Sequence, residues 1–399
     1  MNKLLLLFAL ASFTASAEDR VLAALQDKLL AEQASQLSTD DRIAFYGTLV
    51  KAQPETLQYQ VLLASGYIQK MRETMDFGYL DRAEKVLDTV VDSDSANYEA
   101  LRLRTVIQLE RHNFTTVVDL SRRLTGIAPM DAWNWGTLGD AFIELGDYGQ
   151  AADAYQRMMN IRPDLASYNR AAHYRFLNND VQGAIKTMEL AISAGSNSSE
   201  NVAWCWVELG AYYAKTGQTE EAQRAYSSAL QTFVNYHPAY AGLGKIQAAK
   251  GETAKAIENF RRAQSITPLP DYAAALYDLY LASGQKEEAA KQKQLIEVID
   301  QLGRANGEKA NRNLALIYAD HDWNRERSLE LATAELEYRG DVYTYDALAW
   351  ALYKNGRYAD AQNAMDQALK LHTPEPQFQR HARLIQEANH PTTSSKGAE

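Results

Sequence analysis

The chain has 399 residues, 46% of them hydrophobic, a formal net charge of −10 and a single cysteine. A chain of this length and apolar content can bury a core without disulfide bonds. The acidic balance disfavours a protein that binds nucleic acid through its phosphates, and we expect no nucleic-acid partner.

The first seventeen residues have the pattern of a signal peptide. Lys3 precedes an apolar run from Leu4 to Leu10 that is too short to span a bilayer, and the run ends in the small residues Ala15-Ser16-Ala17. We expect cleavage after Ala17, which also removes Lys3 and leaves 40 basic against 51 acidic residues, a net charge of −11. The alternatives are an uncleaved anchor or a frayed terminal helix.

The cleavage pattern implies export, and the bacterial periplasm fits an exported chain that cannot form an intramolecular disulfide. Secretion from a eukaryotic cell is the alternative, because the stretches that begin at Asn113 and Asn197 match the N-glycosylation pattern. No later segment is apolar enough for a membrane span.

After a helical lead over residues 18–56, one pattern recurs about every 34 residues. It consists of a large apolar residue, a small residue, an aromatic or apolar residue three positions later, a turn with Gly or Asn, and then alanine. In chain order the copies carry Leu63, Ala64, Tyr67 and Ala83; Leu101, Gln108, Val117 and Ser121; Trp135, Leu138, Gly139, Phe142 and Ala151; Tyr168, Ala171, Ala172 and Ala184; Trp206, Leu209, Gly210, Tyr213 and Ala222; Tyr240, Leu243, Gly244 and Ala256; Leu276, Tyr280 and Ala289; Leu314, Ala315 and Tyr318; and Tyr345, Leu348, Ala349 and Ala361.

These positions resemble the tetratricopeptide repeat, whose W-x₂-L-G-x₂-Y and A-x₃-F positions are occupied by Trp135 to Phe142 and by Ala151 with Tyr155. The resemblance implies an all-α fold, a right-handed α-solenoid of stacked helix-turn-helix repeats. The closing segment Asp341–Ile385, with Trp350 and His381, is similar to exported bacterial members of the family in particular. We expect about nine repeats over residues 57–375, a capping helix over 376–388 and a disordered tail over 389–399. Because one pair cannot bury its own apolar face, the stack should behave as one cooperative unit.

The recurring small residues have a packing role, because two antiparallel helices cross closely only where a side chain is small. We expect Gly139, Gly210 and Gly244 to face alanines of the second helices. The turn residues, such as Gly146 and Asn179, should end each first helix in a left-handed conformation. Extra residues near positions 75, 193–200 and 302–306 should form loops.

In the tetratricopeptide family, five positions of each first helix line a concave groove that receives ligands. The resemblance therefore implies that a line of polar and aromatic residues faces such a groove. These residues are Arg102, Glu110, Trp133, Asp140, Glu144, Asn169, His173, Phe176, Lys215, Lys245, Asp278, Lys309, Arg312, Tyr343, Asp346, Trp350 and Tyr353.

The sequence contains no P-loop, nucleotide-binding glycine fingerprint, serine-hydrolase elbow or zinc-protease motif, so we predict a protein that is not an enzyme and has no cofactor. Asp320-His321-Asp322 offers three metal ligands in a row, but consecutive residues converge poorly on one ion. Cys205 is expected to be a buried thiol, with an intermolecular disulfide as the alternative.

The predicted function is therefore a scaffold of the cell envelope that binds a protein or peptide. A periplasmic receptor for a small ligand, a peptide or a glycan, is the alternative.

Overall fold

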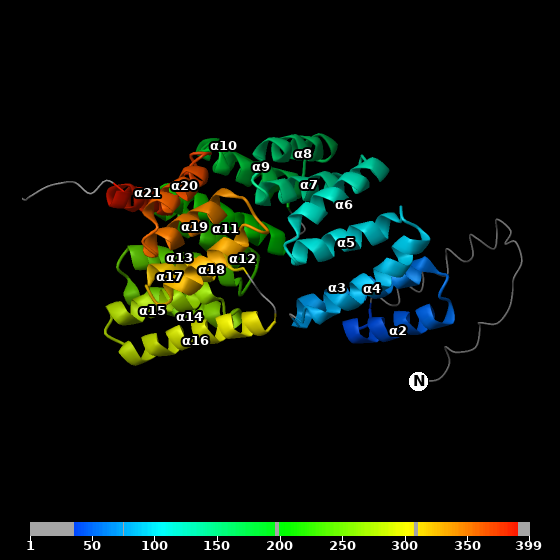
Figure 1. Ribbon diagram of the computed structural model, residues 1–399, viewed down its shortest axis with the longest axis horizontal. Coiled ribbons are helices and arrows are strands. Elements are labelled where there is room, and N and C mark those ends of the chain that lie inside the picture. Colours follow the sequence, from blue (N-terminus) through cyan, green and yellow to red (C-terminus); the bar gives the residue numbers. More distant parts are fainter. Residues whose placement is uncertain (1–35, 75, 196–198, 307–309, 390–399) are drawn as a thin grey trace, which may run out of the picture. The chain divides into compact units, whose positions relative to one another are not determined.

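The computed structural model describes residues 36–74, 76–195, 199–306 and 310–389. Within these ranges the regular structure consists of twenty helices and no strand (Figure 1). None of the described helices is long and apolar enough to cross a membrane. The predicted signal segment, residues 1–17, and the predicted tail beyond Asn389 lie outside the described residues.

The chain forms two compact units that divide between Glu110 and Arg111. The helices of unit 1 are α2 (Thr39–Ala52), α3 (Leu57–Thr74), α4 (Gly78–Ser93) and α5 (Tyr98–Glu110). The helices of unit 2 are α6 (Phe114–Ile127), α7 (Ala132–Glu144), α8 (Tyr148–Ile161), α9 (Leu165–Leu177), α10 (Val181–Ala194), α11 (Ser199–Lys215), α12 (Thr219–Thr232), α13 (His237–Ala249), α14 (Thr253–Ile266), α15 (Pro270–Ala282), α16 (Lys286–Ala305), α17 (Arg312–Asp320), α18 (Arg325–Glu335), α19 (Val342–Lys354), α20 (Tyr358–Ala368) and α21 (Pro376–Asn389).

Consecutive helices pack as pairs, α3 with α4 in unit 1 and α7 with α8 through α19 with α20 in unit 2. The prediction of an all-α array of stacked helix pairs is therefore confirmed. The division into two units was not predicted, because it falls between α5 and α6, which the repeat pattern assigns to one repeat.

The turns inside the repeats form as the sequence predicts. Gly146 has a φ of 74° and Asn179 a φ of 63°, in the left-handed region that ends a helix. The residue that follows each of them caps the next helix: the side chains of Asp147 and Asp180 accept hydrogen bonds from backbone N–H groups in the first turns of α8 and α10.

The atoms nearest to two of the small residues of the first helices belong to aromatic rings of the second helices. A Cβ atom added at Gly139 would collide with the ring of Tyr155, and one added at Gly244 would lie 2.8 Å from the ring of Phe260. The glycine thus makes room for the aromatic ring of the second helix. The partner alanines are still fully buried, with Ala151 and Ala256 at 0% exposure.

Two of the three predicted loops are partly helical. Residues 302–305 continue α16 to Ala305, and Ser199 with Glu200 belongs to α11. The long α16 consists largely of Lys, Glu, Gln, Leu and Ala, which favour a helix, so its extra residues extend the helix before Asn306 ends it.

Candidate binding cleft

Unit 2 closes on itself, because its last repeat contacts helices that lie about two hundred residues earlier. The backbone N–H of Gly340 donates to the carbonyl oxygen of Glu144 over 2.8 Å. The N–H of Val342 donates to the hydroxyl of Tyr148 over 3.0 Å. Beyond α20, the hydroxyl of Thr373 donates to the carbonyl oxygen of Leu177 over 2.7 Å.

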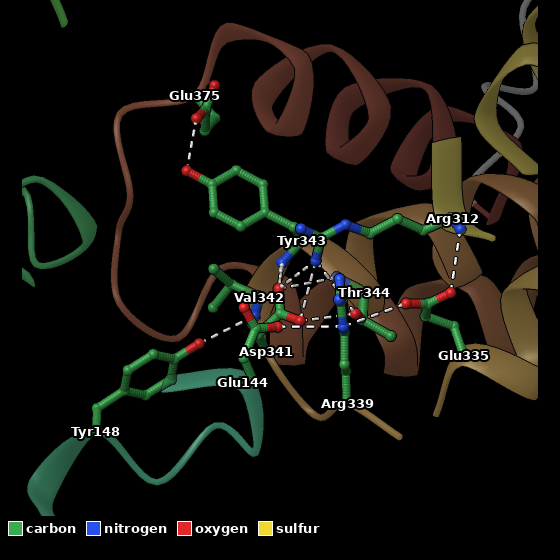
Figure 2. A network of polar contacts seen from close by, with 10 residues as sticks. All are labelled: Glu144, Tyr148, Arg312, Glu335, Arg339, Asp341, Val342, Tyr343, Thr344 and Glu375. Carbon is green, nitrogen blue, oxygen red and sulfur yellow. Dashed lines mark hydrogen bonds and ion pairs between the residues drawn. The ribbon is translucent and has the colours of Figure 1, made fainter. Parts of the chain in front are cut away.

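An ion-pair network lies at this closure (Figure 2). Asp341 caps α19 by accepting from the N–H groups of Tyr343 and Thr344, and it binds the guanidinium of Arg312 at 3.0 Å. Arg339 lies 3.2 Å from a carboxylate oxygen of Glu144 and 3.4 Å from one of Glu335.

Burial raises the pKa of both glutamates at Arg339, while the guanidinium opposes the shift. The buried acids at the closure are therefore neutralised by arginines of the same chain.

A second polar junction ties α11 to the segment before α21. Glu375 is buried and accepts from the ammonium group of Lys215 over 2.6 Å and from the hydroxyl of Tyr343 over 2.8 Å. The Lys215 ammonium also lies 5.3 Å from the ring centre of Phe176. Lys215 is thus engaged inside the protein.

The closure leaves a cleft of about 580 Å³ in unit 2. Its walls come from α7, α8, α9, α11, α17 and the start of α19. The lining residues are Asp140, Ile143, Glu144, Tyr148, Tyr155, Asn169, Arg170, His173, Leu177, Asn201, Trp204, Glu208, Arg312, Asp341 and Tyr343.

Some charged residues of the lining are bound to each other. The guanidinium of Arg170 binds both carboxylate oxygens of Asp140, at 2.7 and 2.8 Å, and the Tyr155 hydroxyl donates to the same carboxylate at 2.9 Å. Asp341 and Arg312 form the second pair. Such bidentate pairs hold the side chains in place but leave little capacity for a ligand.

Other residues of the lining, on α9 and α11, have unused hydrogen-bonding capacity. Across the described ranges, no hydrogen bond or ion pair involves the side chain of His173 on α9 or those of Asn201 and Glu208 on α11. Burial, with a smaller contribution from the charge of Lys215, lowers the pKa of His173 to about 4, so this imidazole is neutral at pH 7. Burial also raises the pKa of Glu208.

The structure brings six of the predicted groove residues together in this cleft, namely Asp140, Glu144, Asn169, His173, Arg312 and Tyr343. Lys215 is close by, through its bond to Glu375. Trp133 is half-buried on α7 and is not part of the lining.

Three predicted groove residues are buried instead. Phe176 is 1% exposed and stacks on Tyr212 with ring centres 4.4 Å apart. Asp346 is 1% exposed and lies 2.8 Å from the Nδ1 atom of His381. Trp350 is 4% exposed and stacks on the same histidine. The helix α21 supplies His381, and no repeat position could indicate that it packs against this face.

The remaining predicted groove residues lie elsewhere. Arg102 and Glu110 belong to unit 1, where Glu110 binds Arg72. Lys245 and Asp278 are exposed on α13 and α15, and Asp278 binds His321. Tyr353 stacks on Trp350, and Lys309 lies outside the described residues.

The sequence prediction missed Trp204, Glu208 and Arg170. Trp204 had a detectable signal, because it lies two residues before Trp206 as Trp133 lies two residues before Trp135. Glu208 lies one helical turn after Trp204, on the same face of α11. Arg170 had no detectable signal in the sequence, since only the tertiary structure places it against Asp140.

The sequence Asp320-His321-Asp322 lies at the turn after α17 and its members have separate partners. Asp320 accepts from Trp350, His321 lies 3.0 Å from Asp278, and Asp322 binds Lys354. Among the described residues, no group of three or more His, Cys, Asp or Glu side chains is arranged to hold a metal ion.

Cys205 is completely buried, as expected. Burial raises the pKa of its thiol to about 12.

Comparison with known proteins supports the repeat assignment. Family models described as "Tetratricopeptide repeat" match residues 135–167, 207–273 and 342–373. The chain is a tetratricopeptide-repeat protein. Its repeats are thus recognised independently in α7 to α9, α11 to α15 and α19 to α20.

One curated relative is the Superkiller complex protein 3 of Homo sapiens, which is 24% identical over 218 residues. The match covers 50% of this chain but 13% of the human protein.

Three solved structures are similar. The APC/C hetero-tetramer Cut9–Hcn1 has a TM-score of 0.47 at 15% identity and covers 88% of this chain and 67% of its own. The type IV pilus biogenesis factor PilW has a TM-score of 0.45 at 14% identity, covering 50% of this chain and 92% of its own. PilF of Pseudomonas aeruginosa has a TM-score of 0.44 at 16% identity, covering 57% and 97%.

Proposed function

We propose that this tetratricopeptide-repeat protein is a non-catalytic scaffold that binds a protein or peptide in the cleft of unit 2. The observation that carries the proposal is the set of lining side chains on α9 and α11 that have no partner in the described chain, His173, Asn201 and Glu208. His173 and Glu208 are partly buried, whereas Asn201 is exposed. A partly buried polar group without a partner is costly, and a ligand that supplies the partner regains that free energy.

An exposed aromatic residue beside these groups supports the same proposal. Trp204 lines the cleft and remains 38% exposed, although most large apolar side chains of unit 2 are buried. Rigid aromatic side chains dominate protein-binding surfaces because they bury a large area with little loss of entropy. The matched repeat family is one of binding scaffolds, and we therefore propose no catalytic role.

A receptor for a small ligand is a second candidate, and the size of the cleft favours it. A volume of about 580 Å³ lies within the usual range of small-molecule sites. A screen of small ligands by thermal shift separates the two candidates. A receptor should show a Tm that rises with the concentration of one small ligand, whereas a scaffold should be stabilised only by its protein or peptide partner.

We also propose that the protein works in the cell envelope, on the strength of the signal pattern that ends at Ala17. Cell fractionation followed by mass spectrometry tests this. The expected result is a periplasmic protein that begins at Glu18. Intact protein beginning at Met1 in the cytosol would refute the location without affecting the binding proposal.

The binding proposal is tested by affinity capture with the mature protein and two variants. Trp204→Ala removes an exposed aromatic residue of the cleft, and Tyr358→Ala removes one on α20, outside the cleft, that is 42% exposed. A partner that is retained by the native protein and by Tyr358→Ala but lost with Trp204→Ala supports the proposal. If every captured protein binds Trp204→Ala equally well, the cleft is not the binding surface.

A further inference from the structure

We infer that the α9–α11 side of the cleft accepts an organic cation, an ammonium or guanidinium group, with Glu208 as its counter-ion. The inference rests on the proposed function and names the chemistry that the cleft would recognise. The cation would belong to a Lys or Arg side chain of a bound peptide or to a small amine.

The first step of the argument is that Glu208 is the one lining carboxylate without a paired cation in the described chain. Asp140 is bound by Arg170, Asp341 by Arg312 and Glu144 by Arg339. The side chain of Glu208 makes no hydrogen bond or ion pair there. Its charge would therefore be compensated best by a group that comes from outside the chain.

The nearest cation of α11 does not neutralise Glu208. Lys215 lies on the same helix, but its ammonium group is bound to Glu375 at 2.6 Å. Lys215 lowers the pKa of Glu208 and Glu375 raises it, while burial has the largest effect and raises it. The two charges of the Lys215–Glu375 pair thus shift the pKa of Glu208 in opposite directions.

The groups around Glu208 suit a cation and not an anion. Asn201, Trp204 and Glu208 lie three and four residues apart and share one face of α11, which contacts α9. An indole face attracts ammonium and guanidinium groups. The amide oxygens of Asn201 and Asn169 and the unprotonated nitrogen of His173 can accept N–H donors from the same group.

A carboxylate ligand would find no available cation among the described residues of this region, because Arg170, Arg312 and Lys215 are all bound to acids of the chain. Its charge would also repel Glu208. The cleft therefore discriminates by the sign of the ligand's charge.

Isothermal titration with blocked pentapeptides tests the inference on the full mature protein. The probes are a peptide with one central lysine, the same peptide with N-acetyl-lysine, and cadaverine as a free amine. We expect saturable binding of the lysine peptide, weaker for the acetylated peptide by about tenfold or more, because acetylation removes the charge. Binding of cadaverine as tightly as the peptide would assign the site to small amines, and weaker binding would assign it to a peptide side chain.

The decisive variant is Glu208→Gln, which keeps the shape of the side chain and removes its charge. We expect it to lower the affinity for the lysine peptide by about tenfold or more. Glu297→Gln on α16, exposed and outside the cleft, is the matched control and should leave the affinity unchanged. Because Glu208→Gln removes a partly buried charge, its Tm should equal or exceed that of the native protein, which excludes unfolding as the cause.

The inference is overturned if the acetylated peptide binds as tightly as the lysine peptide, if Glu208→Gln binds both unchanged, or if no probe binds saturably up to about 10 mM. These failures are distinct from failure of the proposed function. A partner that depends on Trp204 but not on Glu208 would keep the binding cleft and reject only the cation.

Discussion

Replacing Gly146 by alanine, and comparing the result with the same change at Gly217, measures how much the closure of unit 2 contributes to stability. Gly146 ends α7 with a φ of 74°, and a Cβ atom there would collide with the backbone carbonyl of Gly340. Gly217, at the equivalent turn after α11, has a φ of 79° and open space around the position of a Cβ atom. Both substitutions therefore place alanine in a left-handed conformation, and only Gly146→Ala also brings a Cβ atom against the carbonyl of Gly340.

The conformational cost of alanine at a left-handed position is about 1–2 kcal/mol, and we expect Gly217→Ala to lose this amount. Gly146→Ala should lose the same amount and also the contacts that the collision disrupts. These are the hydrogen bonds from Gly340 to Glu144 and from Val342 to Tyr148, each of which contributes about 1 kcal/mol. The total loss should be about 3–4 kcal/mol.

Urea denaturation followed by circular dichroism measures the difference in free energy of unfolding between the two variants. In thermal unfolding, the extra loss of about 2 kcal/mol should make the Tm of Gly146→Ala about 4–8 °C lower than that of Gly217→Ala. Because long repeat arrays can unfold in more than one step, hydrogen exchange provides a local readout. The amides of Gly340 and Val342 should exchange faster in Gly146→Ala and at the native rate in Gly217→Ala. Equal stability of the two variants and unchanged exchange would show that the closure adds nothing to the fold.

Three further predictions concern groups that the repeat pattern does not explain. Arg327→Met should cost about 3 kcal/mol in urea denaturation, because Arg327 and Asp300 form a buried ion pair at 2.8 Å and the carboxylate would lose its main partner. Lowering the pH from about 6.5 to 4 should lower the stability by about 2 kcal/mol through His173, because the unfolded chain binds a proton in this range and the folded chain, with the pKa near 4, does not. The thiol of Cys205 should react with a disulfide reagent only after unfolding, because it is buried and its pKa is raised to about 12.

A second variant accompanies each of the first two predictions, and a refuting result is defined for the third. Arg325→Met removes an exposed arginine of the same helix and should change stability by less than about 0.5 kcal/mol. His173→Gln should remove this part of the pH dependence, and an unchanged slope would contradict the assignment to His173. Labelling of native Cys205 within seconds would mean that the thiol is accessible and that a disulfide between two chains is open to it.

Part of the candidate site could be predicted because the repeat fixes which side chains share a helix face. Asp140 and His173 occupy equivalent positions of two successive first helices, and Asn169 lies one turn before His173 on the same face. The resemblance therefore placed them on one surface, and the structure places them in one cleft. The same reasoning applied to Trp206 would have included Trp204. The pattern failed for Phe176, Asp346 and Trp350, because it assumes an open groove and α11 or α21 covers these side chains.

The sequence by itself determined the local architecture of this protein. The repeat pattern consists of small residues at fixed positions, large residues beside them, and Gly or Asn at the turns. All of these act through contacts between neighbouring segments, so the pattern specifies the helix pairs. The tertiary structure alone decided that Gly340 meets Glu144, that Glu375 binds Lys215 and that Glu208 has no partner among the described residues. These contacts depend on small rotations added over many repeats, and no single repeat encodes their sum.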